Sequence, residues 1–253
     1  MNEILFGLTG NTAKVKVLAE VAARLDNRNS SLRILDIGCT GPQPLAFWEP
    51  ILESYNDLQF VGIDVQGIER AKEVAVKKGW KQVQLLEGSG YHLTSLFPRE
   101  SFDIVVATQV LEHIARPVKF FQEAAAVLRT NGELFLTLDS AHWKSRFALR
   151  YPRRFMKNIV KKALASAGNE RHYDLPWYDF EVSNFAKKAG LQVIDCRYYN
   201  LHPLKFVHNH VVPLEKKHEF MKLWFGLEEL LNVFVGQDDK RFFMGLYFHV
   251  TRC

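Results

Sequence analysis

Residues 32–41 read Leu32-Arg33-Ile34-Leu35-Asp36-Ile37-Gly38-Cys39-Thr40-Gly41, an apolar run that ends in an acid and a glycine-bearing turn. A strand that ends in small residues lets the backbone approach a ligand closely. Two later segments, Phe60 to Asp64 and Phe102 to Val106, have a similar apolar character and also carry an acid. An acid at a strand tip can accept hydrogen bonds from ribose hydroxyls. The first half of the chain is therefore expected to hold a nucleoside-like cofactor.

Strands and helices alternate outward from this run. The pattern predicts strands at 32–37, 58–64, 82–86, 102–107 and 133–138, with helices at 12–25, 45–55, 68–78 and 117–128. Such alternation is typical of βαβ units with a parallel sheet. We predict an α/β fold, namely a doubly wound, three-layer, Rossmann-like sandwich. Its mostly parallel seven-stranded sheet would have an antiparallel edge and a helical cap insert.

The second half of the chain is less regular. The pattern predicts a helix at 177–189, a strand at 191–198, a helix at 216–235 and a final strand at 242–251. The last two strands are expected to pair, with a helical excursion between them. In the helix at 216–235 the apolar residues predicted to be buried are Phe220, Leu223, Trp224, Leu227, Leu230, Leu231 and Phe234. Residues 1–253 are interpreted as a single domain, with a basic helical cap insert at 141–176 after the fifth strand.

Positive charge is concentrated in this insert. The whole chain of 253 residues has a net charge of +5, whereas nine Lys or Arg residues and one acid lie between Lys144 and Arg171. The basic stripe could be a solvated helix face, attract an anionic substrate, or lie on an anionic membrane surface. Nucleic acid is the least favoured partner, because the charge is confined to one insert and no RNA-binding module is present.

Other features of the sequence indicate the cellular compartment. No apolar run is long enough for a membrane-spanning helix, and the first ten residues do not resemble a signal peptide. The three cysteines are widely separated, which fits a reducing cytoplasm. His202, His208 and His210 have no carboxylate or cysteine in a tight motif with them, so we expect no metal.

Four segments lie in the order and at the spacing of a known set of sequence motifs. They are Leu35–Cys39, Gly62–Asp64 with Glu69–Lys72, Phe102–Ala107 with Val110–Ile114, and Val127–Leu134. In this order they resemble the motifs of the class I S-adenosylmethionine-dependent methyltransferases. The resemblance covers residues 32–140 well and 177–194 weakly. It implies S-adenosylmethionine as the cofactor.

The resemblance also implies which residues would bind this cofactor. Asp36 and the Gly38 turn would face its methionine end, Asp64 would accept the ribose hydroxyls, and Val65 would flank the adenine. The full set is Asp36, Gly38, Cys39, Thr40, Gly41, Asp64, Val65, Gly88, Ser89, Gln109 and Val110.

Two positions depart from the family's pattern. The family alternates glycine at every second position after the acid, whereas this chain has Thr40 and Pro42, with Gly41 displaced by one. The third strand of the family ends in an acid after its glycine, where this chain has Ser89. We expect a turn of another shape and a hydrogen bond to adenine without charge assistance.

Histidines and aromatic residues are the candidates for chemistry. His113 follows the fourth strand, where acceptor and cofactor would meet, and His172 lies in a polar, aromatic stretch after the insert. Either imidazole could take a proton from a hydroxyl near neutral pH. Local packing is the alternative for both. The candidate acceptor-binding residues are His113, His142, Tyr173 and Trp177.

The sequence thus predicts an enzyme that transfers a methyl group from S-adenosylmethionine to a small acceptor. A hydroxyl of a sugar or natural product is favoured, and the acceptor could be anionic. Two alternatives stay open: a non-catalytic S-adenosylmethionine-binding protein, and a methyltransferase acting on a lipid-linked or membrane-surface substrate. An NAD-dependent oxidoreductase would need a fuller glycine turn. The oligomeric state is left open.

Overall fold

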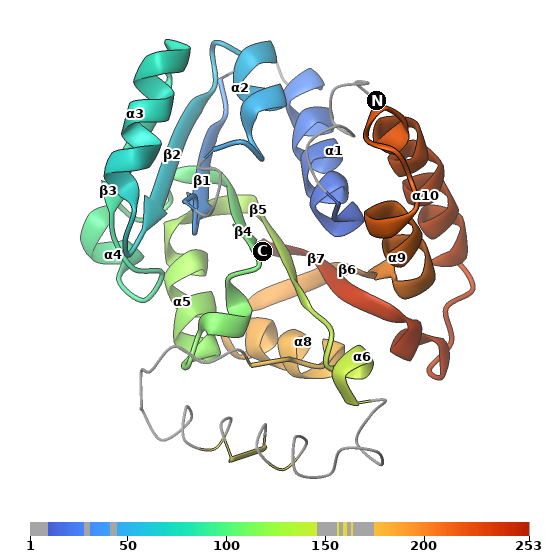
Figure 1. Cartoon of the computed structure of the whole chain (residues 1–253). Coiled ribbons are helices and arrows are strands. Elements are labelled where there is room, and N and C mark those ends of the chain that lie inside the picture. Colours follow the sequence, from blue (N-terminus) through green and yellow to red (C-terminus); the bar gives the residue numbers. More distant parts are fainter. Residues whose placement is uncertain are drawn as a thin grey trace.

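One sheet organises the molecule (Figure 1). The structure is a computed structural model that describes residues 10–27, 31–40, 45–145, 156, 159–160, 163 and 175–252. Within these residues seven strands pair in the order β3-β2-β1-β4-β5-β7-β6. Their bounds are β1 Arg33–Ile37, β2 Gln59–Asp64, β3 Val83–Glu87, β4 Phe102–Thr108, β5 Leu128–Asp139, β6 Leu191–Leu201 and β7 Phe243–Arg252.

Strand directions confirm the predicted topology. Strands β3, β2, β1, β4 and β5 are mutually parallel. Strand β7 runs antiparallel to both β5 and β6, so the last two strands form the antiparallel edge. The chain between them is helical, with α9 at His202–His210 and α10 at Lys217–Leu231. Helix α9 was not predicted.

Helices cover both faces of the sheet and complete three layers. One face packs against α1 Thr12–Asp26, α2 Glu49–Ser54, α3 Ile68–Lys78 and α10. The other face packs against α4 Leu93–Leu96, α5 Pro117–Val127 and α8 Asp179–Lys188. Neighbouring strand residues therefore enter different cores: Ile34 lies on the first side and Leu35 on the second. This is why the central strands are apolar at nearly every position.

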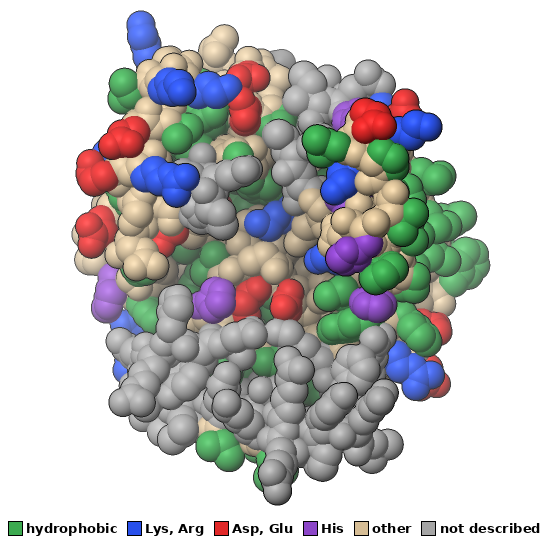
Figure 2. Space-filling view, viewed as in Figure 1, with side chains coloured by type: hydrophobic (Ala, Val, Ile, Leu, Met, Phe, Trp, Pro, Cys, Tyr) green, Lys and Arg blue, Asp and Glu red, His purple; other side chains and the backbone are tan. Residues whose placement is uncertain are grey.

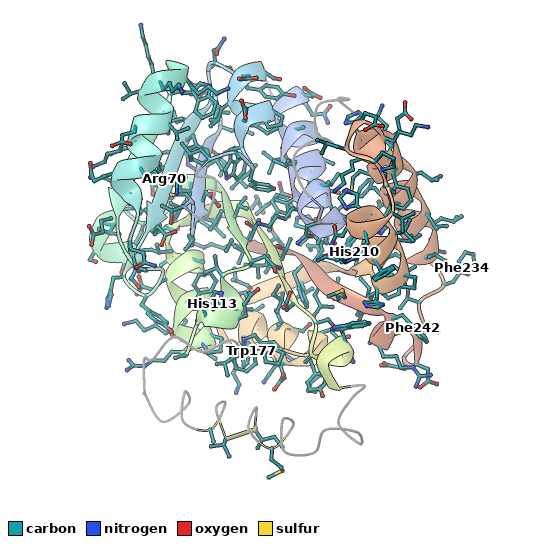
Figure 3. The ribbon with its side chains drawn as sticks, viewed as in Figure 1. Arg70, His113, Trp177, His210, Phe234 and Phe242 are labelled. Atoms are coloured by element: carbon teal, nitrogen blue, oxygen red, sulfur yellow. The ribbon has the colours of Figure 1, made fainter. Side chains whose placement is uncertain are left out.

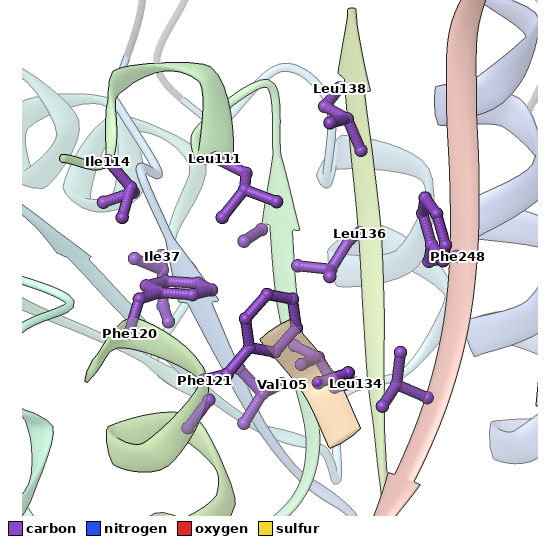
Figure 4. Packing of buried hydrophobic residues seen from close by; sticks show 14 of the residues in the cluster. Ile37, Val105, Leu111, Ile114, Phe120, Phe121, Leu134, Leu136, Leu138 and Phe248 are labelled. Atoms are coloured by element: carbon purple, nitrogen blue, oxygen red, sulfur yellow. The ribbon is translucent and has the colours of Figure 1, made fainter. Parts of the chain in front are cut away.

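The second core is built on aromatic side chains of α5 (Figure 4). Phe120 and Phe121 are fully buried and pack against strand residues such as Val105 and Leu136. Burying an aromatic or aliphatic side chain of this size contributes about 1.5–3 kcal/mol relative to leaving it exposed. The core therefore fixes the central strands, whose carboxyl ends carry the candidate site.

Local sequence sets where several helices begin and end. The Asn11 side chain accepts a hydrogen bond from the Lys14 amide at 3.3 Å and so caps α1. Helix α3 ends at Gly79, whose left-handed φ of 71° is one that glycine adopts readily at the end of a helix. The helix predicted at 45–55 begins only at Glu49, because Leu45 has φ of 61° and lies outside helical geometry.

The prediction for the buried face of α10 was wrong in part. Trp224 is buried as expected, together with Met221 and Phe225, which were not singled out. Leu223, Leu227, Leu230 and Phe234 are exposed instead. The helix carries apolar residues on two sides, and only one side contacts the sheet and α1.

The segment after β5 leaves the sheet next to the point where the chain returns at Trp177. Helix α6, Ala141–Ser145, starts directly beyond β5, and the Ala141 amide donates to the Trp177 carbonyl at 3.0 Å. Ser140 and Trp177 form a parallel bridge. Most of the predicted insert lies outside the described residues, so the insert at 141–176 and the single domain at 1–253 stay predictions. None of the described helices has the length and apolar character needed to cross a membrane.

Candidate cofactor-binding site

The site lies where the strand order reverses. From β1 the chain proceeds to β2 and β3 on one side and then returns to β4 on the other side. In open α/β sheets such a switch point leaves a crevice outside the carboxyl ends of the two strands. The segments that follow β1, β2 and β4 meet there, as the motif spacing predicted.

Gly38 and Val110 lie against each other at this switch point. Gly38 has φ of 84°, and its amide donates to the Ile63 carbonyl at 2.8 Å. A Cβ at Gly38 would lie 2.5 Å from Cγ2 of Val110, so only glycine fits the turn beside that side chain. Gln109, the residue before Val110, also has a left-handed backbone, with φ of 59°.

Asp36 is the buried acid of the turn. Its Oδ2 accepts a hydrogen bond from Nε1 of Trp48 at 2.7 Å, and its Oδ1 is buried without a hydrogen-bond partner among the described residues. Burial raises the pKa of Asp36 to about 7, although the Trp48 hydrogen bond and the charge of Lys14 oppose the shift. A cationic donor reaching Oδ1 would satisfy this atom.

Sequence reasoning missed two residues of this cluster, Lys14 and Trp48. The ammonium of Lys14 lies 5.7 Å from the ring centre of Phe47 and interacts electrostatically with Asp36 and Glu112. Burial lowers the pKa of Lys14. Nothing in its helical spacing indicated this role. Trp48 offered one signal, because a buried tryptophan needs an acceptor for its indole N–H.

Asp64 is held by the unusual turn. Its Oδ2 accepts from the Thr40 amide at 3.2 Å and from Thr40 Oγ1 at 2.6 Å, and its Oδ1 accepts from the Val65 amide at 2.7 Å. A carboxylate has about four acceptor positions, so these bonds leave about one. Thr40 Oγ1 also lies 3.2 Å from the Gln66 carbonyl. It can therefore turn to that oxygen and release Asp64 for a second hydroxyl.

The predicted adenine side is open to solvent. Val65 is 55% exposed beside Asp64. The Gly88 amide donates to the Asp64 carbonyl at 2.9 Å, which brings the end of β3 next to the end of β2. Ser89 Oγ accepts from the Tyr91 amide at 3.2 Å and so shapes the turn that follows. These residues form one side of the crevice.

Cys39 is a buried member of the turn. Its amide donates to the Ile63 carbonyl at 3.2 Å, and burial raises the pKa of its thiol. A Cβ at Gly62 would lie 2.9 Å from the Cys39 sulfur, so Cys39 fills the space that Gly62 leaves. The thiol therefore packs the turn and is not poised to react.

His113 lies at the end of a short 3-10 helix, Leu111–His113, that follows β4 (Figure 3). Its side chain is exposed, while the neighbouring Glu112 is buried. His113 is thus solvent-accessible and lies three residues after Val110, which contacts the Gly38 turn. This position is compatible with its predicted role.

The other candidates for acceptor binding are held by packing. Trp177 is 4% exposed, and its Nε1 donates to the Leu111 carbonyl at 3.0 Å. His142 Nε2 lies 2.9 Å from Oδ1 of Asp179. Hydrogen bonds from His142, Lys240 and Tyr198 hold the pKa of Asp179 far below its usual range despite burial. These contacts give Trp177 and His142 partners within the chain, and their role in acceptor binding stays a prediction. Gly41, His172 and Tyr173 lie outside the described residues.

The histidines of α9 were considered above as possible metal ligands. His208 is buried, and its ring centre lies 5.6 Å from that of Trp224. Within the described ranges, no three His, Cys, Asp or Glu residues are placed to hold a metal ion.

Comparison with known proteins identifies this arrangement. Residues 28–189, well over half of the chain, match the sequence family described as a methyltransferase domain. The chain belongs to the methyltransferase domain family. The resemblance to class I S-adenosylmethionine-dependent methyltransferases is thereby confirmed, and S-adenosylmethionine is the cofactor of this family.

Similar proteins were found among curated sequences and solved structures. The ubiquinone biosynthesis O-methyltransferase of Bradyrhizobium sp. (strain ORS 278) is 31% identical over 152 residues, which are 55% of this chain and 54% of that protein. The chain thus spans about half the length of this curated relative. A methyltransferase from Methanosarcina mazei has a TM-score of 0.58 at 15% identity, covering 91% of this chain and 96% of that one. The 4+2 cyclase SpnF has the same TM-score at 16% identity, covering 94% of this chain and 80% of that one.

The described residues fit the cofactor. Asp36 offers a buried acceptor that has no hydrogen-bond partner among the described residues, which suits an ammonium group, and the lack of a side chain at Gly38 lets the turn lie against Val110. Asp64 offers carboxylate oxygens at the next strand tip, and Val65 offers an exposed apolar surface. The methionine end, ribose and adenine would therefore lie along the ends of β1, β2 and β3 in that order.

Proposed function

We propose that this methyltransferase-family chain methylates a hydroxyl of a small acceptor, such as a sugar or a natural product. The observation that carries the proposal is the buried Oδ1 of Asp36, which has no hydrogen-bond partner in the described part of the chain, beside the Gly38–Val110 contact. This arrangement suits the cofactor's methionine end at the switch point. The name of the Bradyrhizobium relative, an O-methyltransferase, supports oxygen as the acceptor atom.

Alignment is the main task of the protein in such a reaction. S-adenosylmethionine supplies a methyl group bound to a positively charged sulfur, and this sulfur is a good leaving group. Asp36 and Asp64 would fix the two ends of the cofactor, and the Gly38 turn would bring the backbone close to it. The acceptor oxygen must lose a proton, and a ring nitrogen of His113 would accept it. His172 stays a second candidate for this role, and an anionic acceptor stays a prediction.

One alternative is a protein that binds the cofactor without methyl transfer. The 4+2 cyclase SpnF shares this fold, and a fold alone does not determine the reaction, so this alternative stays open. A lipid-linked acceptor is the other alternative from the sequence, and it rests on the basic insert, most of which lies outside the described residues.

The test is a turnover assay with matched acceptors. Purified protein with S-adenosylmethionine is offered sugars and phenolic natural products, each paired with an analogue that has an amine in place of the hydroxyl. We expect S-adenosylhomocysteine to form with the hydroxyl member of at least one pair, and mass spectrometry to find one added methyl group. Turnover of amines alone would contradict O-methylation. Tight cofactor binding without turnover of any acceptor, including lipid-linked phenols in vesicles, would favour the non-catalytic alternative.

His113→Ala tests the proton acceptor in the same assay. We expect at least a tenfold loss of kcat with unchanged cofactor affinity, because general-base catalysis contributes on the order of 100-fold or more. His210→Ala is the matched control, because His210 is an exposed histidine on α9 (Figure 3). Equal kcat for both variants would exclude His113 as the base.

A further inference from the structure

The outer side of α10 exposes a continuous row of large apolar residues. We define the α10 stripe as Leu223, Leu227, Leu230, Val233 and Phe234, which are 39–75% exposed. Their spacing of three and four residues places them on one side of the helix and of the turn that follows it. Figure 2 shows hydrophobic side chains gathered on the flank of the molecule where Figure 1 draws α10.

The stripe cannot rotate into the core. The opposite side of α10 is anchored by Trp224 and Glu228, which are both buried. The Glu228 carboxylate accepts hydrogen bonds from Thr12 Oγ1, from the amides of Asn200 and Leu201, and from Trp224 Nε1. These bonds tie α10 to α1 and to β6 and fix its rotation. The exposure of the stripe is therefore a fixed property of the fold.

The exposed area is large for a monomer. Phe242, 44% exposed, lies on the same side of the molecule as Phe234 (Figure 3), and Leu214, 83% exposed, precedes the helix. The largest apolar patch of a typical monomer measures about 300–600 Å², and patches beyond that size mark interaction sites. The stripe with Phe242 and Leu214 comprises seven large apolar side chains that are 39–83% exposed, which points to an interaction site, and a standard interface buries about 800 Å² per partner.

We propose that a second copy of this chain covers the α10 stripe, with the two α10 helices packed antiparallel about a two-fold axis near Leu227. A row of leucines at this spacing is self-complementary, as an isologous contact requires. Gly226 lies next to Leu227, and a Cβ built there meets nothing within 4 Å. The glycine leaves space for the facing helix at the centre of the contact.

The charges at the two ends of α10 match this orientation. The sequence Glu215-Lys216-Lys217 stands at the amino end, and Asp238, Asp239 and Arg241 lie beyond the carboxyl end. In an antiparallel pair about an axis near Leu227, Lys216 would face Asp238 of the second copy, while Lys240 of the same segment pairs with Asp179 of its own chain. Opposite charges would meet at both ends, whereas a parallel pair would bring like charges together.

A membrane surface fits this stripe less well. Helices that lie on anionic membranes carry mainly Lys and Arg on their polar side. The rim here is mixed, with three acids and four bases at the two ends, and one of the bases, Lys240, pairs with Asp179 of its own chain (Glu215, Asp238, Asp239, Lys216, Lys217, Lys240 and Arg241). The mixed rim favours a protein partner with the same pattern.

Light scattering with matched variants tests the proposal. We expect the wild-type chain to have twice the monomer mass of 29.2 kDa. The double variant Leu227→Glu/Leu230→Glu should fall to the monomer mass, with circular dichroism unchanged. Val76→Glu is the control, because Val76 is 80% exposed on α3 at the opposite side of the molecule. A wild-type chain that is monomeric up to its solubility limit, or a double variant that stays dimeric, would overturn the proposal.

A cysteine cross-link tests the position of the proposed two-fold axis. In a Cys253→Ser background, Gly226→Cys places a thiol near the proposed axis, and mild oxidation should join two chains. Val76→Cys in the same background should not cross-link. Absence of a Gly226→Cys cross-link in a dimer would contradict a two-fold axis near Leu227. A monomeric chain that sediments with anionic vesicles, and loses this in the double variant, would assign the stripe to a membrane instead.

Discussion

Gly38 is the residue at which one added methyl group should disturb the cofactor site most. Its φ of 84° costs other residues about 1–2 kcal/mol, and a Cβ would lie 2.5 Å from Val110. We expect Gly38→Ala to weaken S-adenosylmethionine binding at least tenfold, as measured by isothermal titration calorimetry. Gly79→Ala is the control, because Gly79 has φ of 71° but meets nothing within 4 Å. Equal losses of affinity in the two variants would contradict this reading of the turn.

Asp64 tests the ribose contact. Its carboxylate oxygens stand at the tip of β2, and a carboxylate that binds two hydroxyls contributes about 1–3 kcal/mol. Asp64→Ala should therefore raise the dissociation constant of S-adenosylmethionine by about 5- to 150-fold. Glu69→Gln, an exposed change on the next helix, should leave it unchanged. An unaltered constant for Asp64→Ala would show that β2 does not hold the ribose.

Asp36 should make cofactor binding depend on pH. Burial raises its pKa to about 7 from an ordinary value of 3.8, so the folded protein keeps a proton that the unfolded chain has lost. The free energy of unfolding without cofactor should therefore fall as pH rises from about 4 to 7. The ionised form attracts an ammonium group, so affinity should rise between about pH 6 and 7.5. Asp36→Asn should flatten that rise, and a rise of equal slope in the variant would exclude Asp36.

At the scale of elements, Glu228 links α10, α1 and β6. Its carboxylate accepts hydrogen bonds from four buried donors, and burial raises its pKa to about 7. Glu228→Ala would leave those donors without an acceptor and should lower the free energy of unfolding by about 2–5 kcal/mol. Urea denaturation measures this. Glu219→Ala, an exposed change on the same helix, should stay within about 0.5 kcal/mol, and a similar loss there would contradict the role of Glu228.

The sequence predicted the elements that alternate regularly. Continuous apolar runs with acids or small residues at their ends located the central strands, and the order of motifs placed Asp36, Gly38, Asp64 and Val110 at one crevice. For helix α10, the sequence did not predict which side is buried. The helix carries apolar residues on two sides, and hydropathy does not distinguish the side that meets α1 from the side that meets solvent. The Thr40–Asp64 bonds were also beyond prediction, because they depend on how the altered turn closes.

The whole molecule should respond to its cofactor. A ligand at 100 times its dissociation constant stabilises the folded state by about 2.7 kcal/mol, which corresponds to about 5–10 °C in Tm for a chain of this size. S-adenosylmethionine and S-adenosylhomocysteine should each give such a shift in differential scanning fluorimetry. NAD should give none, because the turn after β1 has no Gly-x-Gly-x-x-Gly pattern. A shift with NAD alone would reopen the oxidoreductase interpretation.

The place of β7 has a consequence for how the chain is made. Strand β7 lies between β5 and β6, although it is the last of the three to be translated. When β6 leaves the ribosome it has no partner, and the flank of β5 stays an open template until β7 arrives. Nascent chains that stall in this interval would be clients for chaperones. Truncation before Phe243 should therefore cause aggregation rather than a slightly smaller folded protein.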